Sequence, residues 1–197
     1  MTYILGLTGS IGMGKSKTAQ MFADHGVPTW DADAVVRELY AAGGVGAKLI
    51  AQHYPDVIKD GTVSRDKLRE LIKVNTNILD HIQSLVHPLV AADRAAFLTR
   101  STAKVILLDI PLLFEMGTDV LCDAIAVVSV PADVQKSRVL ARNEMTEADF
   151  NLLLARQLPD EQKRRKARWV ISTLTLDVAQ SQVKDILADI DKELANA

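Results

Sequence analysis

Five short apolar runs divide the chain, and glycine, proline or aspartate directly follows four of them. The runs cover residues 3–8, 27–30, 105–108, 124–130 and 169–171. The strongest two, 105–108 and 124–130, are continuous rather than alternating in polarity, which is typical of strands buried on both faces. Because helical patterns separate the runs, the sequence predicts an α/β fold with a parallel sheet covered on both sides.

Between the runs, apolar residues recur at helical spacing. Helices are expected over residues 15–25, about 33–41, 132–142, 146–157 and 177–194. Residues 42–101 are predicted to be a mostly helical insertion with weak strand character. Its helical segments cover 47–54, 64–74 and 87–98. The predicted turns lie at Gly43-Gly44, Pro55-Asp56, Asp60-Gly61 and His87-Pro88.

Composition narrows the class of protein. The 197 residues are 48% hydrophobic, with a formal net charge of −2, which indicates a folded protein and disfavours a globally basic nucleic-acid binder. The one cysteine, Cys122, cannot form an intramolecular disulfide, which suits a reducing compartment. No apolar run approaches the roughly 18 residues that a membrane span needs, and the N-terminal run lacks signal-peptide features. We therefore expect a cytoplasmic protein.

Residues 9–16, Gly-Ser-Ile-Gly-Met-Gly-Lys-Ser, match the phosphate-loop pattern G-x-x-x-x-G-K-[ST]. The glycines allow backbone N–H groups to converge on phosphate oxygens, and the following helix presents its positive N-terminal end. Lys15 can bridge the terminal phosphates, while the Ser16 hydroxyl can ligate Mg²⁺. An ordinary glycine-rich turn is the alternative, but the position between a predicted strand and a predicted helix favours nucleotide binding.

Acidic residues follow two of the predicted strands. Asp31 and Asp33 come after the second strand, where Asp33 is the candidate base for an acceptor hydroxyl and Asp31 equally suits a helix cap. Asp109 ends the strongest strand, as expected of an acid that supports Mg²⁺, although a turn residue is the alternative. Glu115 is either a supporting acid or a surface residue.

Basic residues gather late in the chain. Arg138 and Arg142 lie four apart on a predicted helix and so share a face, where they bind phosphate or are solvated. The basic stretch 156–168 is either a lid over bound phosphates or a solvated surface. His87 is either a substrate-facing side chain held at a turn or a surface residue at a helix start.

These residues favour a small phosphotransferase, since no guanine-reading Asn-Lys-x-Asp segment is present. Together they resemble the dephospho-coenzyme A kinase family. The segments that carry the resemblance are 6–16, Asp31-Ala32-Asp33 with Arg37, His87-Pro88, 109–115, Gln135 with Arg138 and Arg142, and Gln157. Another small-acceptor or nucleoside monophosphate kinase, and a non-catalytic ATP-binding module, remain as alternatives.

The resemblance implies transfer of the γ-phosphate of ATP to the ribose 3′-hydroxyl of dephospho-CoA. We also expect Mg²⁺ as a cofactor, and no nucleic-acid, membrane or obligate protein partner. It also implies a five-stranded parallel P-loop core like that of nucleoside monophosphate kinases (residues 1–36, 102–142 and 167–197), a helical substrate domain (37–101) and a lid (143–166).

The implied site residues follow from the same family motifs. They are Asp33, Lys15 and Arg142 for catalysis; Gly9, Ile11, Gly12, Met13, Gly14, Lys15, Ser16, Lys17, Arg138 and Arg142 for ATP; Asp33, Arg37, His87, Leu113 and Glu115 for dephospho-CoA; and Ser16 and Asp109 for the metal. The chain departs from the family pattern at Ser10, Met13, Lys17, Arg168 and Thr173.

Overall fold

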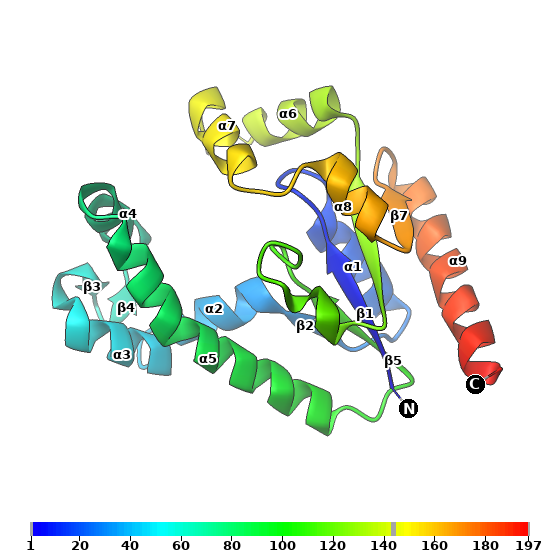
Figure 1. The fold of residues 1–197 in the computed structure, drawn as a ribbon, viewed down its shortest axis with the longest axis horizontal. Helices are drawn as coiled ribbons and strands as arrows, with labels where there is room; N and C mark the ends of the chain where they lie inside the picture. The colour runs from blue at the N-terminus through cyan, green and yellow to red at the C-terminus, as the bar shows by residue number, and fades with distance from the viewer. Residues whose placement is uncertain (1, 143–144, 197) are drawn as a thin grey trace. The chain divides into compact units, whose positions relative to one another are not determined.

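The computed structural model describes residues 2–142 and 145–196. The chain divides into two compact units (Figure 1). The first unit combines Met1–Trp30 with Thr102–Ala197, and the second is Asp31–Ser101. Residues 143 and 144, which begin the predicted lid, lie outside the described residues.

A five-stranded sheet with the order β2-β5-β1-β6-β7 forms the centre of the first unit. The strands are β1 (Tyr3–Thr8), β2 (Thr29–Asp31), β5 (Val105–Asp109), β6 (Ala124–Ser129) and β7 (Trp169–Ser172). The pairs β1–β5, β1–β6 and β6–β7 are parallel. Every residue of β5 and β6 is buried, which explains why their sequences are continuously apolar. The predicted parallel sheet is confirmed.

Helices α1 (Lys15–Asp24) and α9 (Leu176–Ala195) pack against each other, and α9 also packs on β7. Their core includes Phe22, Val183 and Ile190, each with an exposed fraction of 0%. Burying a side chain of this size contributes roughly 1.5–3 kcal/mol. The remaining helices of this unit are α6 (Ala132–Leu140), α7 (Glu147–Ala155), α8 (Asp160–Lys166) and the 3-10 helix η2 (Thr118–Leu121).

The second unit is mainly helical and has its own core, which includes Ile50, Val57 and Ile82. Its elements are α2 (Ala32–Tyr40), α3 (Val45–His53), the 3-10 helix η1 (Pro55–Val57), β3 (Ile58–Lys59), β4 (Thr62–Val63), α4 (Arg65–Val74) and α5 (Asn77–Arg100). The antiparallel β3–β4 hairpin turns through Asp60 and Gly61, which both have positive φ, as a two-residue turn of this kind requires.

The predicted turn at His87-Pro88 is wrong, because both residues lie inside the 24-residue helix α5. Proline in a helix interior removes one hydrogen bond and costs about 3 kcal/mol. The helix continues because Ile82 and Val86 before the proline are buried in the core of the second unit and Val90 after it packs on the same core. Neither α5 nor any other described helix is long and apolar enough to cross a membrane.

Candidate functional site

The loop between β1 and α1 has the backbone geometry of an anion site. Gly12 and Gly14 adopt φ of 78° and 92°, values that favour glycine. Gly14 is the N-cap of α1, and no side chain caps this end of the helix. The first N–H groups of a helix have no partner within it, and they carry the positive end of its dipole. A phosphate group can therefore bind at the start of α1.

Lys15 and Asp109 form an ion pair at the C-terminal ends of the sheet strands. The lysine Nζ lies 2.6 Å from Oδ1 of the aspartate, and the two side chains are only 12% and 4% exposed. Lys15 begins α1 and Asp109 ends β5. The structure thus brings together two residues that the sequence proposed for phosphate and metal binding. Ser16 follows Lys15 and is exposed.

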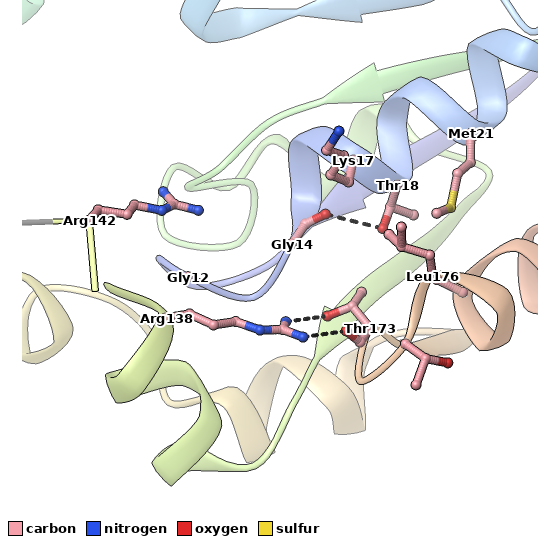
Figure 2. A pocket seen from close by; sticks show the side chains of 11 residues that line it. Gly12, Gly14, Lys17, Thr18, Met21, Arg138, Arg142, Thr173 and Leu176 are labelled. Atoms are coloured by element: carbon pink, nitrogen blue, oxygen red, sulfur yellow. Dashed lines mark hydrogen bonds between the residues drawn. The ribbon is translucent and has the colours of Figure 1, made fainter. Parts of the chain in front are cut away.

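Thr173, just beyond β7, ties the loop to α6. Its hydroxyl donates to the Met13 carbonyl at 2.6 Å. Arg138 donates to the same hydroxyl at 3.2 Å and to the Thr173 carbonyl at 2.7 Å (Figure 2). A Cβ atom on Gly14 would lie 3.0 Å from the threonine Oγ1, so glycine permits this close packing. The sequence marks Thr173 only as a departure from a family pattern, whereas in the structure its hydroxyl bonds to the phosphate loop.

A pocket of about 250 Å³ opens beside the loop (Figure 2). Its lining comes from the phosphate loop, α1, the end of α6 and the residues after it, the β7–α9 connection and the start of α9. The lining residues are Gly12, Gly14, Lys17, Thr18, Met21, Arg138, Arg142, Thr173, Thr175, Leu176 and Ala179. The pocket can hold a flat apolar group next to the loop, with positive charge at Lys17 and Arg142.

The two predicted phosphate arginines differ in their surroundings. Arg138 lies on α6 and uses its guanidinium to hold Thr173. Arg142 is exposed and lies beyond the end of α6 at Leu140, so the prediction that both arginines belong to one helix is wrong by two residues. Both nevertheless line the same pocket. Of the two, Arg142 is the better placed to bind a phosphate.

Hydrogen bonds and packing within the protein hold several residues of the phosphate loop. The Met13 N–H donates to the Ser10 carbonyl at 3.1 Å, while its side chain is buried and accepts from the Val130 N–H at 3.2 Å. The Ile11 N–H donates to Oε1 of Gln157 at 3.3 Å. Gly9 is buried and packed tightly, since a Cβ atom there would lie 2.3 Å from the Val128 side chain. These contacts shape the loop.

Glu115 binds a lysine from the basic stretch. Its Oε1 lies 2.8 Å from Nζ of Lys163, which is fully buried, and accepts from the Leu158 N–H at 2.8 Å. Burial alone would raise the pKa of Glu115, but the ion pair with Lys163 and the hydrogen bond from the Leu158 N–H outweigh it and lower the pKa. The basic stretch is thus not uniformly solvated. Leu113 is fully buried and its carbonyl accepts from Thr118, so its side chain presents no exposed surface to a substrate.

The second unit holds the remaining candidates. Oδ1 of Asp31 accepts from the Ala34 N–H and caps α2, so the helix-cap alternative applies to this aspartate. Asp31 also pairs with Arg37 at 3.7 Å. Asp33 lies in the first turn of α2 and is exposed, as is His87 on α5. The Asp33 carboxylate has no hydrogen-bond or ion-pair partner within the described part of the second unit.

Comparisons with known proteins show what this chain is similar to. The family model described as dephospho-CoA kinase matches residues 3–176. A dephospho-CoA kinase from Ruegeria pomeroyi is 50% identical over 190 residues, which cover 96% of each chain. The crystal structure of TT1252 from Thermus thermophilus covers 95% of this chain and 97% of its own, with 28% identity and a TM-score of 0.84. A dephospho-CoA kinase from Campylobacter jejuni shares the fold, with 20% identity, a TM-score of 0.72 and coverage of 98% and 99%.

Proposed function

The chain belongs to the dephospho-CoA kinase family, and we propose that its phosphate loop, Asp33 and Arg142 transfer the γ-phosphate of ATP to the ribose 3′-hydroxyl of dephospho-CoA. The family match supports ATP-dependent formation of CoA as the activity. The buried Lys15–Asp109 pair beside an uncapped helix N-terminus is the structural observation that carries the proposal.

ATP binds with its phosphates on the loop and its adenosine in the neighbouring pocket. The backbone N–H groups at the start of α1 receive phosphate oxygens. The apolar side chains of Met21, Leu176 and Ala179 give the purine ring a surface to pack on. Lys17 and Arg142 line the same pocket and supply positive charge near the phosphates.

Charge stabilisation is the main task of the protein in phosphoryl transfer, because negative charge spreads over the transferred group. The Lys15 ammonium and the Arg142 guanidinium perform it. The Ser16 hydroxyl and the Asp109 carboxylate fit Mg²⁺, which uses few protein oxygens together with substrate phosphates. When bound, the ion would neutralise phosphate charge.

Asp33 accepts the proton of the acceptor hydroxyl. The 3′-oxygen forms a bond to the γ-phosphorus, the bond to the bridging oxygen of ADP breaks, and the proton passes to the Asp33 carboxylate. Because Asp31 caps α2, Asp33 is free of that role. We assign dephospho-CoA binding to residues 37–101, with Arg37 and His87 at the acceptor, and the role of a lid to residues 143–166, of which the part near Leu158 is held by Glu115. Leu113 is buried in the first unit and Glu115 binds Lys163 there, so we assign both an indirect role in dephospho-CoA binding.

A phosphotransfer assay with Mg·ATP tests the proposal. Dephospho-CoA is expected to be phosphorylated, and nucleoside monophosphates are expected to be poor acceptors. Phosphorylation of a nucleoside monophosphate with indifference to dephospho-CoA would instead establish the alternative kinase. ATP binding without transfer to either acceptor would indicate a non-catalytic module.

A further inference from the structure

Two glutamine side chains form hydrogen bonds with both backbone groups of Ile11, a residue of the phosphate loop. The Ile11 carbonyl accepts from Nε2 of Gln135 at 2.7 Å, and the Ile11 N–H donates to Oε1 of Gln157 at 3.3 Å. Gln135 belongs to α6 and is 4% exposed, whereas Gln157 lies between α7 and α8. Two elements distant in sequence thus fix the orientation of the loop backbone at Ile11.

An ion pair between the buried Lys163 and the partly exposed Glu115 lies next to Gln157. Oε1 of Glu115 accepts from the N–H of Leu158, the residue directly after Gln157, and also binds the buried Nζ of Lys163. Lys163 lies on α8, which packs on β6. At the start of α8, Asp160 accepts from the Ser129 hydroxyl at 2.7 Å. The chain at Leu158 is therefore anchored to the sheet, and Gln157 extends from this anchored point to the loop.

We propose that Gln157 is a positioning residue for ATP binding and that Glu115, which accepts from the N–H of the next residue, Leu158, holds it against the phosphate loop. The inference rests on the proposed function, because it requires that the loop bind ATP. A loop whose backbone is already oriented loses less conformational freedom when it binds phosphate. Loss of one hydrogen bond of this kind weakens binding by about 2- to 10-fold.

The variant Gln157→Met tests the first half of the proposal, since it keeps the length of the side chain and removes Oε1. The dissociation constant of a fluorescent ATP analogue is expected to rise about 3- to 10-fold. With ATP saturating, kcat and the KM for dephospho-CoA are expected to stay within about twofold of wild type, because the groups in contact with the acceptor are unchanged. Gln162→Met is the matched control, because Gln162 is exposed on α8. Equal nucleotide affinity in the two variants would overturn the proposal.

Amide hydrogen exchange at Ile11 gives a second measurement that does not depend on activity. Without nucleotide, the Ile11 N–H is expected to exchange faster in Gln157→Met than in wild type or Gln162→Met. An unchanged exchange rate would contradict the contact itself. An inactive wild-type protein would contradict the proposed function instead, whereas an active wild type with a normal Gln157→Met variant would contradict only this inference.

Two double variants test the role of the Glu115 acceptor without leaving a buried charge. Glu115→Gln with Lys163→Met keeps an acceptor for the Leu158 N–H, whereas Glu115→Ala with Lys163→Met removes it. Faster exchange at Ile11 is expected in the alanine double variant and not in the glutamine double variant. The same exchange rate in both would show that Glu115 does not position Gln157.

Discussion

The Nζ atom of Lys15 lies 2.6 Å from Oδ1 of Asp109 in an almost fully buried ion pair. The pair joins the first residue of α1 to the last residue of β5. Asp109 thereby holds the ammonium group at the C-terminal edge of the sheet, next to the loop glycines. Such a contact orients the lysine before a phosphate arrives, which is the condition for effective electrostatic stabilisation.

Replacement of Lys15 by alanine is expected to weaken ATP binding and to lower kcat/KM by about 10²-fold or more, because a charge that acts on the transferred phosphate is lost. Steady-state kinetics with dephospho-CoA and a binding titration with an ATP analogue measure the two effects. Lys184→Ala, on the exposed surface of α9, is the control and should behave as wild type. Near-normal kcat/KM in Lys15→Ala would exclude the lysine from phosphate stabilisation.

Asp33→Asn is expected to retain ATP binding while kcat falls about 10²- to 10⁴-fold, because the amide cannot accept the proton of the acceptor hydroxyl. Single-turnover measurements with saturating ATP separate the chemical step from product release. Asp31→Asn is the matched control: asparagine still caps α2, so kcat should change little. If the two variants had the same rate, Asp33 would not be the base.

The sequence predicted the sheet well because its strands are buried on both faces. A continuous apolar run such as 105–108 directly indicates a strand that is buried on both faces. The β3–β4 hairpin was missed because its two-residue strands are too short to show any periodicity. The turn predicted at Pro88 is wrong because the positions on either side of the proline pack on the core of the second unit, and this tertiary packing outweighs the local effect of proline.

The site shows the same division between local and tertiary signals. The glycines of the phosphate loop and Lys15 form a contiguous sequence motif in which each position has a known role in phosphate binding, so the sequence alone identifies them. Lys163 lies in a run of basic residues that predicts a lid or a solvated surface, and its burial depends on Glu115, far away in the sequence. Thr173 belongs to no motif, and only the fold brings its hydroxyl to the Met13 carbonyl.

Thr173→Val tests whether that hydroxyl supports the nucleotide site. The variant keeps the shape of the side chain but leaves the buried Met13 carbonyl and an Arg138 N–H without this partner. We expect a loss of stability of about 1–3 kcal/mol and a several-fold weaker affinity for ATP. Chemical denaturation and a nucleotide titration measure these changes. Thr99→Val, which removes an exposed hydroxyl from α5, should change neither, and a Thr173 variant equal to it would contradict the role.

The Glu115–Lys163 pair predicts a specific pH dependence of stability. The pKa of Glu115 is lowered in the folded protein. Burial opposes the charged form, but the ion pair with Lys163 and the hydrogen bond from the Leu158 N–H favour that form more. A lowered folded-state pKa contributes stability that is present above the unfolded value, near 4.5, and that is lost as the pH falls through the folded value.

Glu115→Gln is therefore expected to have a lower Tm than wild type at pH 7. The difference should shrink as the pH falls below the unfolded value, because the unfolded protein then takes up a proton at this position more readily than the folded protein does. Thermal unfolding of both proteins at a series of pH values measures this convergence. Glu161→Gln, which breaks an exposed pair with Arg165, is the control and should follow wild type throughout. A Glu115→Gln curve parallel to that of wild type down to pH 3 would show that this carboxylate does not contribute to the acid sensitivity of the fold.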